Sequence, residues 1–394
     1  MFQLSITPLV IILASVLVAA LLYLLLFFRH YVSSVSHAVD RDSSDPLPDP
    51  SQFRYPSVSV IVYSQDDASN LEVLLPEILD QDYPAPFEVI VVNDGAVSSV
   101  KDVIARLERE HSNLYMTFTP GDSRSLSRKK LALTLGIKAA RYETVFHTTG
   151  NCQVPSRLWL KSMARHFAPG TELVIGYASP AAASDEVKES HRRLHAFDRV
   201  RQAVEYLSWA IAGRPYRGTC HNLAYRRELF FNSKGFSRSL DLKYGDDDVF
   251  VSQVADGSNT AVELSADSML LCVETDPAKS HHDDKLRYNF TAPRLKGHAR
   301  AFFGSCSVAW WVAMGSAVAL ALVGLPSLIP LIFAAVLLLV TWIVLMVTWR
   351  NTSIALWSRP TLLTFPWFMT IYPFYSLIYR IRGLRTRRNN YAWG

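Results

Sequence analysis

Two long apolar segments, one near each end of the chain, constrain this sequence more than any other feature. Residues 4–28 are almost wholly apolar, and about 25 helical residues exceed the ~30 Å hydrocarbon core of a bilayer. Residues 307–347 form an apolar run about twice as long as one crossing, interrupted by Gly324, Pro326 and Pro330. The pattern predicts a transmembrane anchor over 4–28 and a transmembrane hairpin over 307–347 that turns at the glycine and the prolines.

The charges that flank the first segment predict its orientation. No basic residue precedes it, and Arg29 and His30 follow it directly. A secretory signal has a basic start and a shorter apolar core, so the pattern favours an uncleaved anchor. The positive-inside bias then places the residues after the anchor in the cytoplasm, and we expect an integral protein of a bacterial inner membrane.

A third apolar stretch, residues 362–379, leaves its topology open. It contains Pro366 and Pro373 and is rich in aromatic residues. A single crossing would place the arginines of the basic tail, 380–394, outside, against the positive-inside bias. A re-entrant or interfacial segment, with a cytoplasmic tail, is therefore favoured over a third crossing. Because the net charge of +5 is concentrated near these apolar segments, we expect membrane lipids as a partner and no nucleic acid.

Composition excludes several classes of protein. With 49% hydrophobic residues the chain is too apolar for disorder. The four cysteines show no CxxC pair and no regular spacing, which argues against a disulfide scaffold and favours a reducing compartment. Three apolar segments without a charged residue inside them are too few to enclose a transport pathway.

Between the membrane segments, residues 57–305 alternate between strand-like and helix-like runs. A linker over 29–56, rich in Pro, Ser and Asp in its second half, precedes them. The predicted strands are 57–63, 87–92, 114–119 and 144–147, and the predicted helices are 70–81, 100–110 and 129–140. This alternation is typical of βαβ units, so we predict an α/β domain with a mostly parallel, Rossmann-like sheet.

In such sheets the ligand lies beyond the carboxyl ends of the strands, and polar residues follow three of them here. These residues are 64–67, 93–95 and 148–151. Asp94 directly follows an apolar strand and precedes a glycine, so it is suited to accept a hydrogen bond from a uracil N3–H or a ribose hydroxyl. From the residues alone, a helix cap or a turn at Asp94 is an equally good interpretation.

Residues 59–95 resemble the nucleotide-binding half of family 2 glycosyltransferases, which have the GT-A fold. Five features follow one another at the spacing of the family. They are a strand, an acidic pair, Asn-Leu, Gln-Asp-Tyr-Pro and a second strand that ends in Asn-Asp-Gly. The resemblance extends through 129–143, 218–230 and 244–251, and so covers roughly residues 55–305. The flanking apolar segments fit the membrane-bound branch of the family.

The resemblance implies a membrane-anchored, inverting glycosyltransferase of the hexosyltransferase type. It would move a sugar from a nucleotide-sugar, with UDP expected, to a lipid-linked or polysaccharide acceptor at the cytoplasmic face, as in polysaccharide or cell-envelope biosynthesis. Asp67 takes the place of the acidic residue after the first strand, and Asp94 that of the aspartate that binds uridine. Lys129 and Lys130 are expected to face the diphosphate, with a solvated helix start as the alternative.

Three adjacent carboxylates after Gly245 are the strongest chemical signal. Because Asp246, Asp247 and Asp248 repel one another, a fold keeps them together mainly when a cation, a hydroxyl substrate or a helix N-terminus holds them. In the register of the family, Asp246 is the general base that takes the proton of the acceptor hydroxyl, and Gly245 replaces a glutamate. Asp247 is the alternative base if the register shifts by one, and a helix N-terminus that carries acids is the structural alternative.

Two further segments predict contacts with the donor or the acceptor. His221 and Asn222 are candidates to donate to sugar hydroxyls, with a structural histidine as the alternative, and Asp248 belongs to the same group. Arg287 and Tyr288 stand where processive members carry the Arg-Trp of a Gln-x-x-Arg-Trp motif, and are expected to clamp the diphosphate and to stack on the acceptor sugar. The glutamine of that motif is absent, so processivity stays open.

The end of the fourth strand departs from the family pattern. Family members carry Asp-x-Asp there, and the two carboxylates bind the Mg²⁺ or Mn²⁺ that neutralises the diphosphate. This chain has Thr149-Gly150-Asn151, while Cys152 and Pro155 keep the register.

Three accounts of this departure stay open. Asn151, with phosphates, waters and one of the acids at 246–248, could hold a weak Mg²⁺ or Mn²⁺ ion. Cations such as Lys130 or Arg287 could replace the metal. Alternatively, the domain is catalytically impaired and serves as a scaffold or partner of another transferase.

Overall fold

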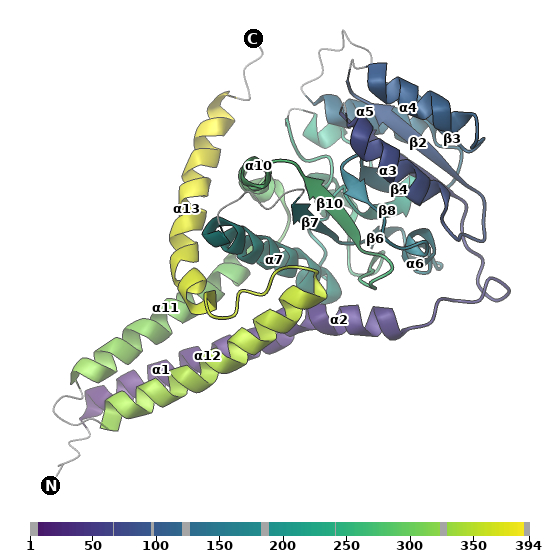
Figure 1. Ribbon diagram of the computed structural model, residues 1–394. Helices are drawn as coiled ribbons and strands as arrows, with labels where there is room; N and C mark the ends of the chain where they lie inside the picture. Colours follow the sequence, from purple (N-terminus) through teal and green to yellow (C-terminus); the bar gives the residue numbers. More distant parts are fainter. Residues whose placement is uncertain are drawn as a thin grey trace. The chain divides into compact units, whose positions relative to one another are not determined.

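The computed structural model describes residues 7–65, 67–95, 98–119, 127–182, 189–240, 242–323 and 329–389. The chain forms two compact units. Unit 1 consists of Met1–His37, Lys188–Ser208 and His298–Tyr379, and unit 2 consists of Ala38–Val187, Trp209–Gly297 and Arg380–Gly394. Unit 1 is helical, and the described β-strands belong to unit 2 (Figure 1).

Unit 1 is built from long apolar helices. Its elements are α1 (Pro8–Phe27), η1 (Phe28–Val32), the first part of α7 (Glu189–Ile211), α11 (Ala299–Val323), α12 (Ile329–Ala355) and part of α13 (Phe365–Asn389). Three helical stretches are long and apolar enough to cross a membrane, namely Pro8–Ser44, Ala299–Val323 and Ile329–Ala355. Pro330 lies in the first turn of α12, where its missing N–H breaks no helical hydrogen bond. Gly324 and Pro326, expected in the hairpin turn, and residues 4–6 of the expected anchor lie outside the described residues.

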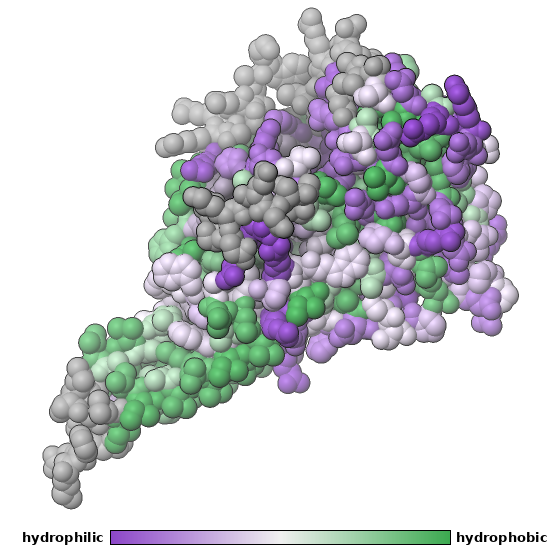
Figure 2. Space-filling model, viewed as in Figure 1, coloured by the Kyte–Doolittle hydropathy of each residue, from purple (hydrophilic) through white to green (hydrophobic). Residues whose placement is uncertain are grey.

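Helix α1 packs along α11 and α12 with one face and leaves the other exposed. Leu17 and Leu24 are buried, and the ring of Phe27 lies 5.5 Å from that of Phe302, centroid to centroid. Figure 2 shows a continuous hydrophobic surface over the end of the bundle where α1 and α12 lie in Figure 1. An apolar surface of this size is unfavourable in water, so unit 1 supports membrane association.

The third apolar stretch forms the first half of α13, which contains Pro373. At its start, Phe365 packs against Trp349 and Phe197, with ring centroids 5.6 and 6.1 Å away. Helix α13 is not one of the three stretches apolar enough to cross a membrane. The re-entrant or interfacial placement of 362–379 stays a prediction, and residues 390–394 of the basic tail lie outside the described residues.

The expected linker over 29–56 is helical in its first half. Helix α2 (Ser33–Ser44) continues from η1, and extended chain begins only after it. The end of α2 is held within unit 2, because Arg165 donates to the carbonyl oxygens of Asp42 and Asp45 at 2.9 and 3.0 Å. These bonds satisfy carbonyls that a helix C-terminus otherwise leaves unpaired, which explains why the helix persists beyond the apolar residues.

A seven-stranded mixed sheet forms the centre of unit 2, in the order β3-β2-β1-β4-β8-β6-β9. Its strands are β1 (Val58–Ser64), β2 (Phe87–Asn93), β3 (Leu114–Phe118), β4 (Thr144–Thr149), β6 (Leu173–Ile175), β8 (Leu223–Arg226) and β9 (Thr260–Val262). Strands β3, β2, β1 and β4 are parallel, and β8 runs antiparallel between β4 and β6. The predicted α/β class and the mostly parallel sheet are confirmed.

Helices α3 (Ala68–Leu79), α4 (Ser98–Glu108) and α5 (Arg128–Ala139) of unit 2 lie at the three predicted places. Further helices that were not predicted follow, namely α6 (Trp159–Ala164), α8 (Arg227–Asn232), α9 (Asp248–Val254) and α10 (Pro277–Thr291), with short 3₁₀ turns η2 (Ser237–Ser239) and η3 (Ala292–Arg294). The core is made of buried side chains such as Val60, Val91 and Leu75. Helix α5 lies close to the sheet at Gly136, where a Cβ would come within 2.8 Å of Val92 Cγ2.

A second sheet of three short strands follows the end of β4. It consists of β5 (Cys152–Gln153), β10 (Leu270–Glu274) and β7 (Ala178–Ala182), with β10 in the middle. Strand β10 pairs antiparallel with β5 and parallel with β7. This sheet brings residues near 272 next to the strand end at 149–152, which are far apart in the sequence.

Candidate active site

The carboxyl ends of β1, β2 and β4 meet at one edge of the sheet, as predicted. Strand β1 lies between the other two, with Ser64 opposite Asn93 and Tyr63 opposite Thr149. The N–H of Asp94 donates to the carbonyl of Ser64 at 2.9 Å, which ties the polar ends together. These strand ends therefore form one continuous polar edge.

Asp67 and Gly150 face each other at this edge. A Cβ on Gly150 would lie 3.3 Å from Ser64 Oγ and 3.4 Å from the Asp67 side chain, so a larger residue at this position would contact both. Asp66, the other member of the acidic pair, lies outside the described residues.

The Asp94 carboxylate is buried and accepts three hydrogen bonds. The donors are Tyr63 Oη at 3.1 Å, Thr119 Oγ1 at 2.7 Å and Arg128 Nε at 2.8 Å. The sequence did not single out Arg128, although it begins the basic run that contains Lys129. Since the Arg128 side chain is partly exposed, a cation stands beside Asp94 at the surface of this edge.

Lys130 is turned away from the strand ends. Its ammonium is buried and donates to the carbonyl oxygens of Ser239, Leu242 and Tyr244 at 2.5, 2.8 and 2.8 Å. This differs from the expectation that Lys130 faces the diphosphate, because three backbone acceptors already occupy its three N–H groups. Lys130 instead holds the loop that leads into the acidic cluster.

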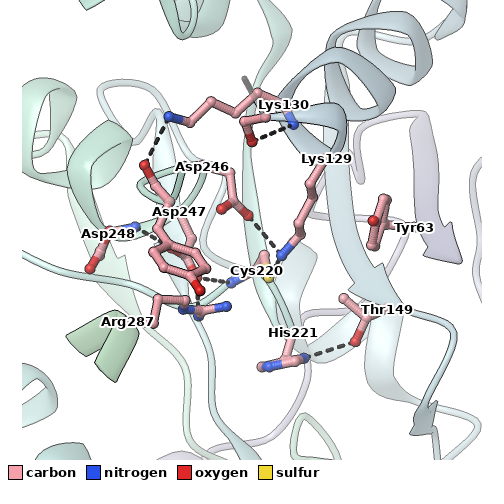
Figure 3. Close-up of polar contacts among 12 residues, drawn as sticks. Tyr63, Lys129, Lys130, Thr149, Cys220, His221, Asp246, Asp247, Asp248 and Arg287 are labelled. Atoms are coloured by element: carbon pink, nitrogen blue, oxygen red, sulfur yellow. Dashed lines mark hydrogen bonds and ion pairs between the residues drawn. The ribbon is translucent and has the colours of Figure 1, made fainter. Parts of the chain in front are cut away.

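Lys129 links the strand ends to the acidic cluster (Figure 3). Its Nζ lies 2.7 Å from Asp246 Oδ2, 2.8 Å from Cys220 Sγ and 5.5 Å from the centroid of the Tyr63 ring. Burial is the largest single influence and would lower the pKa of this ammonium, but Asp246, together with Cys220 and Asp247, outweighs it and raises the pKa well above the usual value. Lys129 is therefore a fixed positive charge at the centre of the site.

The three adjacent carboxylates are buried, and each has a different cation beside it. Asp246 pairs with Lys129, Asp247 Oδ2 lies 2.7 Å from Arg287 Nη2, and Asp248 Oδ2 lies 3.3 Å from Arg217 Nη2. Separate cations explain how the fold keeps three like charges in consecutive positions. The turn itself depends on Gly245, whose φ is +100°.

Asp247 is the most strongly held of the three acids. It also accepts from the backbone N–H groups of Cys220 at 3.1 Å and Asp248 at 2.7 Å, and it caps the start of α9. Burial opposes its charged form, but Arg287 and Lys129 outweigh that cost and keep the pKa of the carboxyl well below its usual range. A carboxylate with so low a pKa is a weak base.

Asp248 has the opposite character. Burial is the main cause that raises its pKa to about 6, and the negative charge of Asp247 adds to this effect, although Arg217 acts against it. Its carboxylate also accepts from the hydroxyl of Thr291 at the end of α10. Asp248 therefore binds α9 to α10 and lies on the side of the cluster away from Lys129 (Figure 3).

The two polar residues before β8 have different surroundings. Asn222 is fully buried; its amide donates to the carbonyls of Tyr177 and Ser268 and accepts from the indole of Trp159. This differs from the expected contact with a sugar hydroxyl, because both ends of the amide are already paired. His221 is partly exposed, and its Nδ1 lies 2.8 Å from Thr149 Oγ1 (Figure 3).

Arg287 and Tyr288 lie on α10, next to the acidic cluster. The Arg287 guanidinium is held by Asp247, and the Tyr288 ring is stacked under the guanidinium of Arg217, 3.5 Å from the ring centroid. One face of the ring that was expected to stack on a sugar is thus covered. Arg217 is a further residue that the sequence did not single out.

The strand end at 149–151 offers a poor set of ligands for Mg²⁺ or Mn²⁺. Thr149 Oγ1 donates to Asn151 Oδ1 at 2.7 Å, and the Asn151 amide nitrogen lies 3.4 Å from the carbonyl of Val273. Both side chains are neutral, whereas hard divalent cations prefer carboxylates. Their neighbours are the thiols of Cys152 and Cys272, which soft metals prefer.

Two groups of three metal-ligating side chains occur among the residues that the structure describes. One is Cys152, His221 and Cys272, and the other is Cys220, Asp246 and Asp247. In the second group, the carboxylates of Asp246 and Asp247 are already paired with Lys129 and Arg287. The first group was missed because Cys272 lies 120 residues from Cys152, and no spacing rule relates them.

Comparisons with known proteins agree with this geometry at the level of the fold. No protein-family model and no curated protein matches the chain. Among solved structures, the chain is similar to the mannosyltransferase PcManGT from Pyrobaculum calidifontis in complex with GDP-Man and Mn²⁺, with a TM-score of 0.51 and 23% identity over 88% of this chain and 96% of that one. Unit 2 has a GT-A-like fold. The chain also matches S. aureus TarS, with a TM-score of 0.39 and 16% identity over 60% of this chain and 39% of that one.

Proposed function

We propose that this protein is a membrane-anchored glycosyltransferase that moves a sugar from a nucleotide-sugar donor to an acceptor hydroxyl with inversion. The observation that carries the proposal is the buried cluster Asp246, Asp247 and Asp248 at the carboxyl edge of a GT-A-like sheet, with a separate cation for each acid. A fold that holds three carboxylates beside three cations at a ligand-binding edge is suited to an anionic donor and a hydroxyl acceptor.

The donor nucleotide is proposed to bind at the ends of β1 and β2. Asp94 would accept from the base or the ribose, and Arg128 and Tyr63 hold its carboxylate in place. Lys129 and Arg287 are the cations that would meet the diphosphate. We propose a UDP-sugar, and GDP-sugars belong in the same test because PcManGT was solved with GDP-Man.

Asp246 is the proposed general base. Asp247 accepts three hydrogen bonds, whereas Asp246 is paired with the ammonium of Lys129 alone among the contacts that the structure describes. When the donor diphosphate draws Lys129 toward itself, the Asp246 carboxylate becomes free to take the acceptor proton. The acceptor oxygen then attacks the anomeric carbon from the face opposite the diphosphate, which leaves toward Lys129 and Arg287.

The acceptor is proposed to be lipid-linked or a growing glycan at the cytoplasmic face of the membrane. The apolar helices α1, α11 and α12 support this proposal, since they would hold the enzyme at the surface where lipid-linked acceptors lie. The basic tail, 380–394, is proposed to contact anionic lipid on the same side.

The test uses the full chain in detergent or nanodiscs with a panel of UDP- and GDP-sugars. We expect hydrolysis of one donor, and its transfer to a lipid extract, to be lost on Asp246→Asn. A protein that binds no donor and turns none over would contradict the proposal. The neutral strand end at Thr149 and Asn151 favours a second candidate, a non-catalytic scaffold, for which donor binding without turnover and an unaffected Asp246→Asn strain are the expected results.

A further inference from the structure

Two thiols and an imidazole meet at the strand end where the family pattern places its metal-binding acids. Cys152 Sγ lies 2.7 Å from Cys272 Sγ and 3.8 Å from His221 Nδ1. The three potential ligand atoms all lie within 4.8 Å of one another. The two sulfurs are buried, while His221 is partly exposed.

The fold places the two cysteines together by strand pairing. Cys152 of β5 stands directly opposite Cys272 of β10 in an antiparallel pair. The neighbouring pair carries the hydrogen bond from the N–H of Val273 to the carbonyl of Asn151, at 2.8 Å, so the cysteines occupy a non-hydrogen-bonded position. Side chains approach most closely at such positions, and both thiols therefore point to the same side of the small sheet.

We propose that Cys152, Cys272 and His221 bind one thiophilic transition-metal ion, with Zn²⁺ as the expected ion. Two thiolates and one imidazole form a Cys₂His ligand set, which suits zinc and leaves a fourth position open. Both thiols would lose their protons to solvent on binding. His221 would stay neutral, with its proton on Nε2 and the metal on Nδ1, in place of its contact with Thr149.

Small side-chain movements allow this geometry. Two thiolates on one tetrahedral zinc, each at ~2.3 Å from it, lie roughly 3.7 Å apart. The sulfurs would therefore separate by about 1 Å, which rotation about the Cα–Cβ bonds provides without a change of the strands. The ion would relieve a contact between two sulfurs that is otherwise very close.

The position of the site suggests what the fourth ligand is. Thr149 and Asn151 adjoin His221, and this strand end is where the donor diphosphate is proposed to lie. We infer that a phosphate oxygen of the donor completes the coordination, so that a soft-ligand site replaces a carboxylate site at the same strand end. Metal binding stands on the three side chains alone, whereas the diphosphate contact rests on the proposed function.

The test is titration of the full-length, reduced protein with Co²⁺ in detergent, followed by displacement with Zn²⁺. We expect one Co²⁺ per chain and a thiolate-to-cobalt charge-transfer absorption that Zn²⁺ abolishes. Cys152→Ser and Cys272→Ser are each expected to weaken Co²⁺ binding by ~100-fold or more. Changes to the residues that merely surround metal ligands already weaken binding by up to about that factor. His221→Ala provides a third variant on a partly exposed side chain, should a cysteine variant fail to fold.

Two other cysteines are matched controls. Cys220→Ser removes the thiol of the second cluster, and Cys306→Ser removes a buried thiol of α11; both are expected to keep the absorption. The proposal is overturned if Co²⁺ gives no thiolate absorption, or if the absorption survives Cys272→Ser. It is also overturned if Cys152 and Cys272 prove to be a disulfide by mass spectrometry and the reduced protein binds no metal.

Donor addition then separates this inference from the proposed function. A UDP- or GDP-sugar that shifts the cobalt spectrum supports a phosphate as the fourth ligand. A cobalt site that forms while no nucleotide-sugar changes its spectrum supports the metal site and contradicts the diphosphate contact. If the wild-type protein gives the expected cobalt spectrum but transfers no sugar from any donor, the result counts against the proposed function and not against the metal site.

Discussion

At the scale of single residues, the site depends on how charge is divided among neighbours. Asp246 and Asp247 are adjacent in sequence, yet Asp247 is held by a guanidinium and two backbone N–H groups, whereas Asp246 is held by one ammonium. Because hydrogen bonds to a carboxylate lower its pKa and its basicity, these two acids are suited to different roles. Asp247 holds Arg287, and Asp246 is the acid that we propose as the general base.

This division predicts the effect of Asp246→Asn. Sugar transfer is expected to fall about 10²- to 10⁴-fold, the usual contribution of a general base. The dissociation constant for the donor is expected to stay the same or fall, because Lys129 loses a competing carboxylate. Stopped-time transfer assays and donor binding by calorimetry measure the two quantities. Asp102→Asn, on the exposed side of α4, is the control, and full transfer activity in Asp246→Asn would contradict the assignment.

The burial of Lys130 predicts a structural effect. Lys130→Met removes a donor from the carbonyl oxygens of Ser239, Leu242 and Tyr244, of which that of Ser239 keeps the N–H of Leu242. Each buried group that is left unsatisfied costs about 1–3 kcal/mol. We expect a clear fall in melting temperature, measured by scanning fluorimetry, and little change from Lys138→Met on the exposed side of the same helix. A wild-type melting temperature with weaker donor binding would instead indicate that Lys130 meets the diphosphate.

At the scale of secondary-structure elements, local patterns were sufficient for the sheet and its helices. Alternation of β-branched runs with helical spacing predicted β1 to β4 and α3 to α5 within about two residues, because these elements depend on short-range periodicity. Pairings over long sequence distances could not be read in this way. The amide of Asn222 meets Tyr177 and Ser268, and Cys152 meets Cys272, only because β10 returns to the end of β4.

The contact between α9 and α10 predicts a pH dependence of stability. Asp248 has a folded-state pKa raised to about 6, above its unfolded value, so the folded state binds a proton that the unfolded state has released. Its contribution to stability is therefore fully present below about pH 4 and is lost as the pH rises through about 6. A shift of about two pKa units corresponds to at most ~3 kcal/mol.

Asp248→Asn removes this titration. Because asparagine does not titrate, the contribution of residue 248 to the stability of the variant is nearly independent of pH. The difference in melting temperature between variant and wild type should therefore move in favour of the variant between pH 4.5 and 7. A difference that stays constant, or that moves in favour of the wild type, would show that Asp248 does not titrate in this range.

At the scale of the whole molecule, the sequence predicted the apolar helices. It placed the end of the N-terminal helix too early. The residues after Phe28 are polar, so they read as a linker, yet the helix continues to Ser44. The reason lies in unit 2, where Asp42 accepts from the N–H of Leu264 at 3.1 Å and Arg165 donates to the last carbonyls of the helix. No local pattern near residue 42 could reveal partners more than 120 residues away.

Arg165 is consequently expected to be a principal support of unit 2. Its guanidinium is buried, lies 2.7 Å from Glu263 Oε2, and donates to the carbonyls of Asp42 and Asp45. Arg165→Met leaves the buried Glu263 carboxylate with His166 and the N–H of Ser265 as its described partners. Breaking a buried ion pair costs about 3–5 kcal/mol. For a domain of this size the melting temperature should fall by roughly 5–15 °C.

Arg157→Met is the matched control, because Arg157 forms an exposed pair with Asp80 at 2.8 Å, and exposed pairs contribute little. Scanning fluorimetry of both variants in the same detergent makes the comparison. Limited proteolysis adds the location, since cleavage should appear first between residues 38 and 56, where the end of the helix has lost its partner. Equal melting temperatures for the two variants would mean that the N-terminal helix end is held by the apolar contacts of the domain and not by Arg165.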